Sequence, residues 1–118
     1  MKKKIILITS ILLVISLISI FILLKSNKTF FNTIYTGVEN QKIFIPKYSY
    51  FKDECCMTAA VFYTLRSEKE LKKEINNYMK DFKYFSDETT YGYRKGNLFI
   101  QTYEVEDHGL YREIIIVY

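Results

Sequence analysis

The chain has 118 residues, 49% hydrophobic and 25% charged, with one Pro and four Gly, which excludes a disordered, collagen-like or low-complexity protein and allows one small domain. The net charge of +4 arises in the first 28 residues, which hold five Lys and no acidic residue. Residues 29–118 hold the other 12 of the 17 Lys and Arg and all 13 Asp and Glu, so this part is almost neutral. A near-neutral domain lacks the basic footprint of a nucleic-acid binder, so nucleic acid is excluded as a partner.

Residues 5–24 form an apolar run, IILITSILLVISLISIFILL, that carries no charge. A helix of this length covers about 30 Å, the thickness of the hydrocarbon core of a bilayer. Three Lys in residues 1–4 precede the run and two follow it, which by the positive-inside rule favours a cytoplasmic N-terminus and an outer C-terminal domain. The sequence therefore predicts a single-pass protein of the cell membrane, with the lipid bilayer as one partner.

A cleaved signal peptide is the alternative, because basic residues also precede the apolar core of such peptides. The run is longer than the usual core of about 7–15 residues, and its end at Leu24, Lys25 and Ser26 offers no small-x-small cleavage site. We therefore expect an uncleaved signal-anchor. The excess of Lys over Arg, with 11 Tyr and 9 Phe, is typical of a bacterial protein from an AT-rich genome.

The juxtamembrane segment, residues 25–50, is rich in aromatic side chains that follow no long period. Residues 42–45 fit a short edge strand ended by Pro46, since proline has no amide hydrogen for a strand ladder. Aromatic side chains next to an anchor also suit the headgroup layer of a membrane. The pattern is compatible with an edge strand and with a membrane-hugging stalk.

The remainder, residues 51–118, predicts an α+β domain of two layers, a helix packed on an antiparallel sheet. Residues 55–65 are rich in β-branched and aromatic side chains and free of Gly and Pro, which favours a strand. Ser67 and Glu70 form a capping box, which predicts the start of a helix over 67–82. Its apolar stripe has helical spacing: Leu71, Ile75, Tyr78, Met79 and Phe82.

Three antiparallel strands are expected after the helix, at 89–94, 97–105 and 110–118, because turn signals separate them. A turn at Lys95-Gly96 and a loop at 106–109 set their register. This register places one apolar set under the helix: Tyr91, Tyr93, Leu98, Ile100, Ile115 and Val117.

The opposite face of these strands then combines aromatic, aliphatic and Arg side chains, which are typical of protein interfaces. We interpret it as a candidate interaction face, formed by Arg94, Phe99, Gln101, Tyr103, Arg112, Ile114 and Ile116. The alternative is that residues 29–50 cover these side chains as ordinary core.

The order of one strand, one helix and three antiparallel strands resembles that of cystatin-type domains, including the small extracytoplasmic modules that bacteria attach to single membrane helices. The resemblance is one of topology over residues 55–118 and includes no family motif. It implies a fold and carries over no functional residue.

Cys55 and Cys56 are adjacent, so their Cα atoms lie about 3.8 Å apart, below the usual range of a disulfide. We expect structural packing, with an intermolecular disulfide and a reactive thiol as the alternatives. Either thiol would form a nucleophilic triad with His108 and Asp107, but an acid adjacent to the His rarely orients its ring. With one His and no paired ligand spacing, the sequence predicts neither a metal site nor a cofactor.

These observations favour a non-enzymatic interaction module held at the membrane, which binds a protein partner or itself. A cysteine-dependent enzyme at the membrane surface is one alternative. A structural homodimer, joined through the candidate interaction face or through Cys55 and Cys56, is the other.

Overall fold

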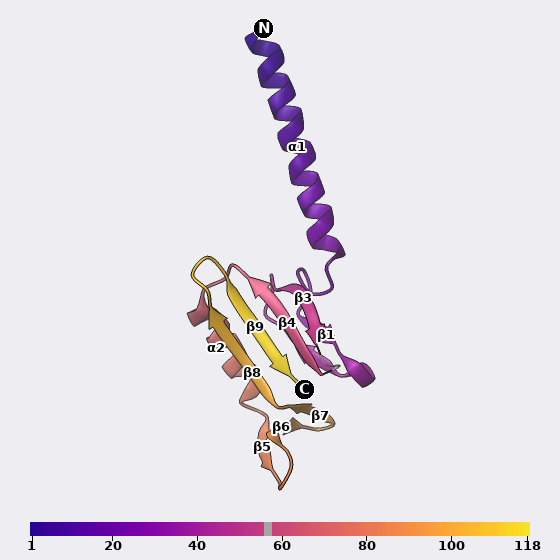
Figure 1. The fold of residues 1–118 in the computed structure, drawn as a ribbon, viewed down its shortest axis with the longest axis vertical. Helices are drawn as coiled ribbons and strands as arrows, with labels where there is room; N and C mark the ends of the chain where they lie inside the picture. Colours follow the sequence, from indigo (N-terminus) through magenta and orange to yellow (C-terminus); the bar gives the residue numbers. More distant parts are fainter. Residues whose placement is uncertain (56–57) are drawn as a thin grey trace.

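A long helix leads into a small sheet-rich domain in the computed structural model, which describes residues 1–55 and 58–118 (Figure 1). The helix, α1 (Lys2–Ser26), is the single helix of the described chain that is long and apolar enough to span a membrane. Four of its hydroxyl groups donate to the carbonyl four residues earlier, at 2.8–2.9 Å, which lowers their cost in an apolar medium. They belong to Thr9, Ser10, Ser16 and Ser19.

The segment after α1 is a hairpin, which decides between the two alternatives for residues 25–50. β1 (Ile34–Thr36) pairs with β2 (Lys42–Phe44), and the 3-10 helix η1 (Val38–Asn40) joins them. The hairpin contributes three fully or almost fully buried side chains to the core: Tyr35, Ile43 and Ile45. The aromatic residues of this segment are thus partly core residues rather than a stalk.

The main sheet has four antiparallel strands in the order β3-β4-β9-β8. Their bounds are β3 (Tyr50–Cys55), β4 (Ala59–Thr64), β8 (Thr102–Asp107) and β9 (Arg112–Val117). The predicted single strand over 55–65 is wrong at its start, because Cys55 ends β3 and pairs with Ala59 across a hairpin. Strand propensity did not mark this reversal, since the residues between them include no Gly, Pro, Asn or Asp.

The predicted helix is confirmed as α2 (Glu68–Met79), with Ser67 as its N-cap. The Ser67 hydroxyl accepts from the Glu70 amide at 3.2 Å, as the capping box predicts. Leu71 and Ile75 are buried. The helix ends three residues earlier than predicted, yet Phe82 still reaches the core.

A second, three-stranded sheet lies at the end of the domain farthest from α1 (Figure 1). Its strands are β5 (Lys83–Ser86), which was not predicted, β6 (Tyr91–Lys95) and β7 (Leu98–Ile100). The two-residue turn is Gly96-Asn97, because Lys95 pairs with Leu98. Gly96 has φ +59°, a backbone conformation that glycine adopts without strain at the first position of such a turn. Because Tyr93 pairs with Ile100 instead of Leu98, the pairing is two residues from the predicted register.

The predicted strand 97–105 divides at Gln101 into β7 and β8, and this changes which side chains face the helix. Thr102 pairs with Val117, so the loop between β8 and β9 spans residues 108–111 instead of 106–109. Ile114 and Ile116 are fully buried in the core, whereas Ile115 and Val117 lie on the other face. The predicted assignment of faces is wrong, because four consecutive apolar residues carry no alternation that would fix it.

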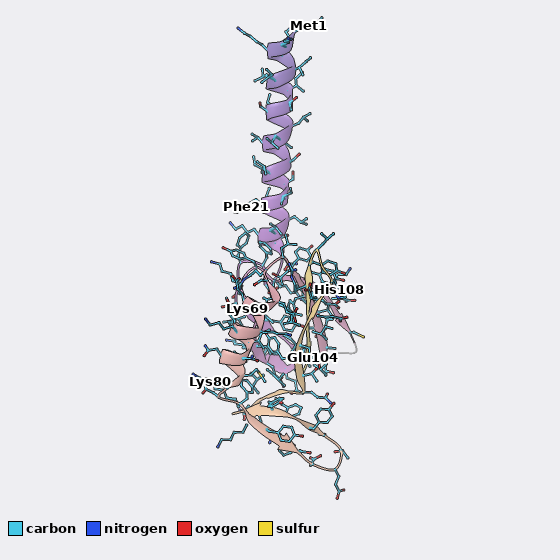
Figure 2. The ribbon with its side chains drawn as sticks, turned by 90° about the vertical axis from the view of Figure 1, so that its left-hand side faces the viewer. Met1, Phe21, Lys69, Lys80, Glu104 and His108 are labelled. Atoms are coloured by element: carbon cyan, nitrogen blue, oxygen red, sulfur yellow. The ribbon has the colours of Figure 1, made fainter. Side chains whose placement is uncertain are left out.

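The core lies on one face of the main sheet, beneath both α2 and the β1–β2 hairpin. Its buried side chains form one cluster: Tyr35, Ile43, Ile45, Ala60, Phe62, Leu71, Phe82, Ile100, Ile114 and Ile116. Figure 2 shows Lys69 of α2 and Lys80, its C-cap, on one side of the domain and Glu104 and His108 on the other. The second face of the main sheet is left uncovered by the described residues.

Candidate functional site

The predicted interaction face is not one surface. Ile114 and Ile116 are buried, and the Tyr103 hydroxyl donates to the Phe44 carbonyl. Burial is the largest cause that raises the pKa of Tyr103. Residues 29–50 therefore cover these side chains as ordinary core. Arg94 and Phe99 lie on the small sheet, where the Arg94 guanidinium stacks 4.6 Å from the Phe85 ring, and Gln101 lies at the bend.

Arg112 binds two loops together instead of presenting its charge to solvent. Its guanidinium donates to the Leu65 carbonyl at 2.8 Å and to the Gly109 carbonyl at 3.1 Å, and it lies 3.5 Å from the Asp107 carboxylate. The loop before α2 and the loop between β8 and β9 are thus held side by side. Arg112 is a structural residue of the end of the domain that adjoins α1.

The described residues do not assemble the hypothetical cysteine triad. Cys55 is exposed at the Ala59–Val117 end of the main sheet, and His108 follows β8 at the Thr64–Arg112 end. Five residues of strand separate these ends, about 17 Å at 3.3 Å per residue. Cys56 lies outside the described residues.

His108 has other partners. Its Nε2 atom lies 2.9 Å from a Glu113 carboxylate oxygen and 3.9 Å from Glu106, and its ring stacks on Tyr111 with centroids 4.9 Å apart. The three ligand atoms lie within 4.8 Å of one another, a spacing at which they could hold a metal ion. These side chains form a polar cluster at the loop end of the β8–β9 hairpin.

The uncovered face of the main sheet carries an apolar strip between acidic borders, which was not predicted from the sequence. We define the open face by the half-buried apolar side chains that the register aligns on β4 and β9: Ala59, Val61, Tyr63, Ile115 and Val117. Asp53 borders the strip on β3, opposite Val61. Glu104 and Glu106 border it on β8, opposite Ile115 and Glu113.

A second candidate is a groove of about 570 Å³ where the open face meets the end next to α1. Its lining is mainly aromatic and comes from four separate segments: Phe30, Tyr48, Tyr50, Tyr63, Thr64, Leu65, Arg66 and Tyr111. The Tyr63 and Tyr111 rings have centroids 5.1 Å apart and those of Phe30 and Tyr48 5.6 Å apart. We call this the aromatic groove.

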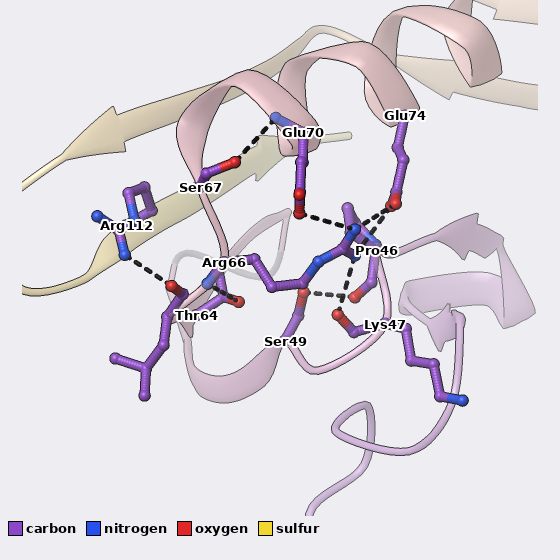
Figure 3. Close-up of polar contacts among 10 residues, drawn as sticks. Pro46, Lys47, Ser49, Thr64, Arg66, Ser67, Glu70, Glu74 and Arg112 are labelled. Carbon is purple, nitrogen blue, oxygen red and sulfur yellow. Dashed lines mark hydrogen bonds and ion pairs between the residues drawn. The ribbon is translucent and has the colours of Figure 1, made fainter.

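Arg66 fixes one wall of the aromatic groove (Figure 3). Its guanidinium makes a two-pronged ion pair with Glu74, lies 3.7 Å from Glu70, and donates to the Lys47 carbonyl at 3.2 Å. Hydrogen bonding of the Arg66 guanidinium to the Glu74 carboxylate, which accepts, is the largest cause that raises the pKa of Arg66. The loop before β3, the loop before α2 and α2 itself are thereby joined at one cation.

Two tyrosines, Tyr35 and Tyr118, join the β1–β2 hairpin to the main sheet. They lie at the end of the sheet opposite the aromatic groove. The Tyr118 hydroxyl donates to the Glu54 carboxylate at 2.7 Å and lies 3.4 Å from the Tyr35 hydroxyl. Burial is the largest cause that raises the pKa of both tyrosines. Both are therefore neutral at physiological pH, and their contacts are those of a structural lock.

The chain matches no described protein family, no curated protein and no solved structure.

Proposed function

We propose that this chain is a single-pass protein of the bacterial cell membrane with its C-terminal domain outside the cytoplasm. In this proposal the domain is a non-enzymatic interaction module. The open face carries the proposal, because an apolar strip with acidic borders fits a protein partner that presents apolar side chains flanked by Lys or Arg. The topology rests on the Lys residues that precede the apolar run of α1.

The edges of the main sheet support the use of its face. Asp53 and Glu54 lie on the edge strand β3, and Glu104, Glu106 and Asp107 lie on the edge strand β8. Charged side chains on edge strands oppose the addition of a further strand. The partner therefore binds across the apolar strip rather than by extending the sheet.

The acidic borders also decide between a foreign partner and a second copy of the chain. Both sides of the strip are acidic, with Asp53 on β3 and Glu104 and Glu106 on β8. Two copies that met through their open faces would bring carboxylates against carboxylates, which costs free energy. Charge complementarity favours a basic partner.

Site-specific photocrosslinking in cells tests this function. A photoreactive amino acid in place of Ile115 should crosslink one defined protein, whereas the same group in place of Tyr84 on the far small sheet should not. Glu104→Lys and Asp53→Lys should abolish the Ile115 crosslink while the domain stays folded. A crosslink that joins two copies of this chain, or one that survives both charge reversals, would overturn the proposal.

The topology needs a separate test. Alkaline phosphatase fused after Tyr118 should be active, and a reporter that works only in the cytoplasm should be inactive at the same position. The reverse pattern would place the domain in the cytoplasm.

A further inference from the structure

We propose that the domain makes a second contact with the membrane. The end of the domain next to α1 rests in the interface of the bilayer that holds α1, and the aromatic groove there binds phospholipid acyl chains. This inference rests on the proposed membrane insertion of α1. The open face apart from Tyr63, which also lines the groove, then remains available to the protein partner.

The first observation is the depth at which α1 meets the domain. Phe21 lies one turn before the end of the apolar run. Its ring centroid is 5.8 Å from that of Phe31, and the Phe31 centroid is 6.3 Å from that of Tyr48. When α1 spans a bilayer, Phe21 lies at its edge. Phe31 then lies at the same depth, and Tyr48 beside it.

The second observation is a pair of exposed leucines at this end of the domain. Leu65 is 80% exposed and Leu110 88% exposed. A single exposed leucine is ordinary on a soluble surface. Here Arg112 fastens both loops together, and the loop between β8 and β9 reaches the level at which α1 ends (Figure 1).

The aromatic groove lies at the same end of the domain. Leu65 forms part of its lining, and Phe30 links it to Phe31 through rings 4.9 Å apart. Four of its lining residues are tyrosines, whose apolar rings and polar hydroxyls are suited to the boundary between acyl chains and headgroups. The groove thus opens where acyl chains of the outer leaflet begin.

Three lysines lie close to the junction of α1 with the domain. Lys25 lies in the last turn of α1, and the Nζ atoms of Lys28 and Lys47 lie 4.9 Å and 5.2 Å from the Phe51 and Tyr48 ring centroids. Lysine side chains at this height attract anionic headgroups. We therefore assign phospholipids, with anionic headgroups preferred, as the ligands of this surface.

Tryptophan fluorescence tests the contact, because the chain contains no Trp of its own. The full chain is reconstituted into vesicles of phosphatidylcholine and phosphatidylglycerol, with and without bromine on the acyl chains. Leu65→Trp and Leu110→Trp should each show a blue-shifted emission that brominated lipid quenches. Tyr84→Trp, at a residue 65% exposed on the far small sheet, is the matched control and should emit as in water.

A fourth reporter separates failure of this inference from failure of the anchor. Leu17→Trp in the middle of α1 should be strongly quenched if α1 spans the bilayer. Quenching of Leu17→Trp together with water-like emission from Leu65→Trp and Leu110→Trp would overturn the second contact and leave the anchor intact. Water-like emission from all four would overturn both.

Discussion

The side-chain amide of Asn27 pairs with the backbone of Phe51 in the way that a neighbouring strand would. Its Oδ1 atom accepts from the Phe51 amide at 2.8 Å, and its Nδ2 atom donates to the Phe51 carbonyl at 3.1 Å. Asn27 is the C-cap of α1, and Phe51 lies near the start of β3. The pair therefore fixes the direction in which the domain leaves the helix.

Replacing Asn27 should loosen this joint. Asn27→Ala removes both hydrogen bonds and should lower the stability of the joint by about 1–3 kcal/mol. Trypsin should then cleave faster after Lys28 in the reconstituted full chain. Asn76→Ala on the exposed side of α2 is the control and should leave the cleavage rate unchanged; equal rates in all three proteins would contradict the role of Asn27.

Two adjacent isoleucines of β9 should behave in opposite ways. Ile116 is fully buried, so Ile116→Ala should lower the free energy of unfolding by about 2–5 kcal/mol. Ile115 lies on the open face, so Ile115→Ala should cost much less stability and should instead weaken partner binding. Thermal unfolding of the full chain in detergent measures both. The reverse order of stability would restore the register predicted from sequence.

The ion pair between Arg66 and Glu74 should depend on the shape of the guanidinium group. Arg66→Lys keeps the charge but loses the two-pronged contact, and Arg66→Ala also loses the hydrogen bond to the Lys47 carbonyl. We expect Arg66→Ala to lower the free energy of unfolding by about 1–3 kcal/mol, measured by chemical unfolding of the full chain. The value for Arg66→Lys should lie between those of the wild type and Arg66→Ala. If the lysine variant matches the wild type, charge alone is sufficient.

The turn between β5 and β6 should open on acidification. The Asp87 carboxylate accepts from the amides of Thr89 and Thr90, each at 2.8 Å, and these bonds lower the pKa of Asp87 below its ordinary 3.8. A lowered pKa in the folded state stabilises the turn above pH 3.8, and this contribution is lost as pH falls through the folded pKa.

Nuclear magnetic resonance titration of the full chain measures this effect. The Asp87 carboxyl should titrate below 3.8, and the Thr89 and Thr90 amide signals should move with the same midpoint. Asp87→Asn should abolish that movement. An Asp87 midpoint at or above the ordinary value would show that the two amide bonds do not form in solution.

The elements that could be predicted from sequence are those with a local signal. α1 follows from an uninterrupted apolar run, and α2 follows from the Ser67 cap and the spacing of Leu71 and Ile75. Both signals depend on residues within a few positions of one another. The predicted α+β class and both predicted helices are therefore confirmed, with small differences at the helix ends.

The faces of the sheet could not be predicted, because they depend on partners far apart in sequence. The apolar residues 114–117 suit either face, and the pairing of Thr102 with Val117, together with the bend at Gln101, decides between them. The open face and the aromatic groove are products of this pairing and of loop contacts. No local pattern records that Phe30, Leu65 and Tyr111 line one groove.

The position of β9 has a consequence for biosynthesis. β9 is the last strand along the chain, yet it lies between β4 and β8 inside the main sheet. During translation α1 leaves the ribosome first, and β4 then still has an unpaired apolar edge. The sheet closes only after residue 117 has emerged, so the sheet-rich domain depends on long-range pairing that forms slowly and is exposed to misassembly until synthesis has passed β9.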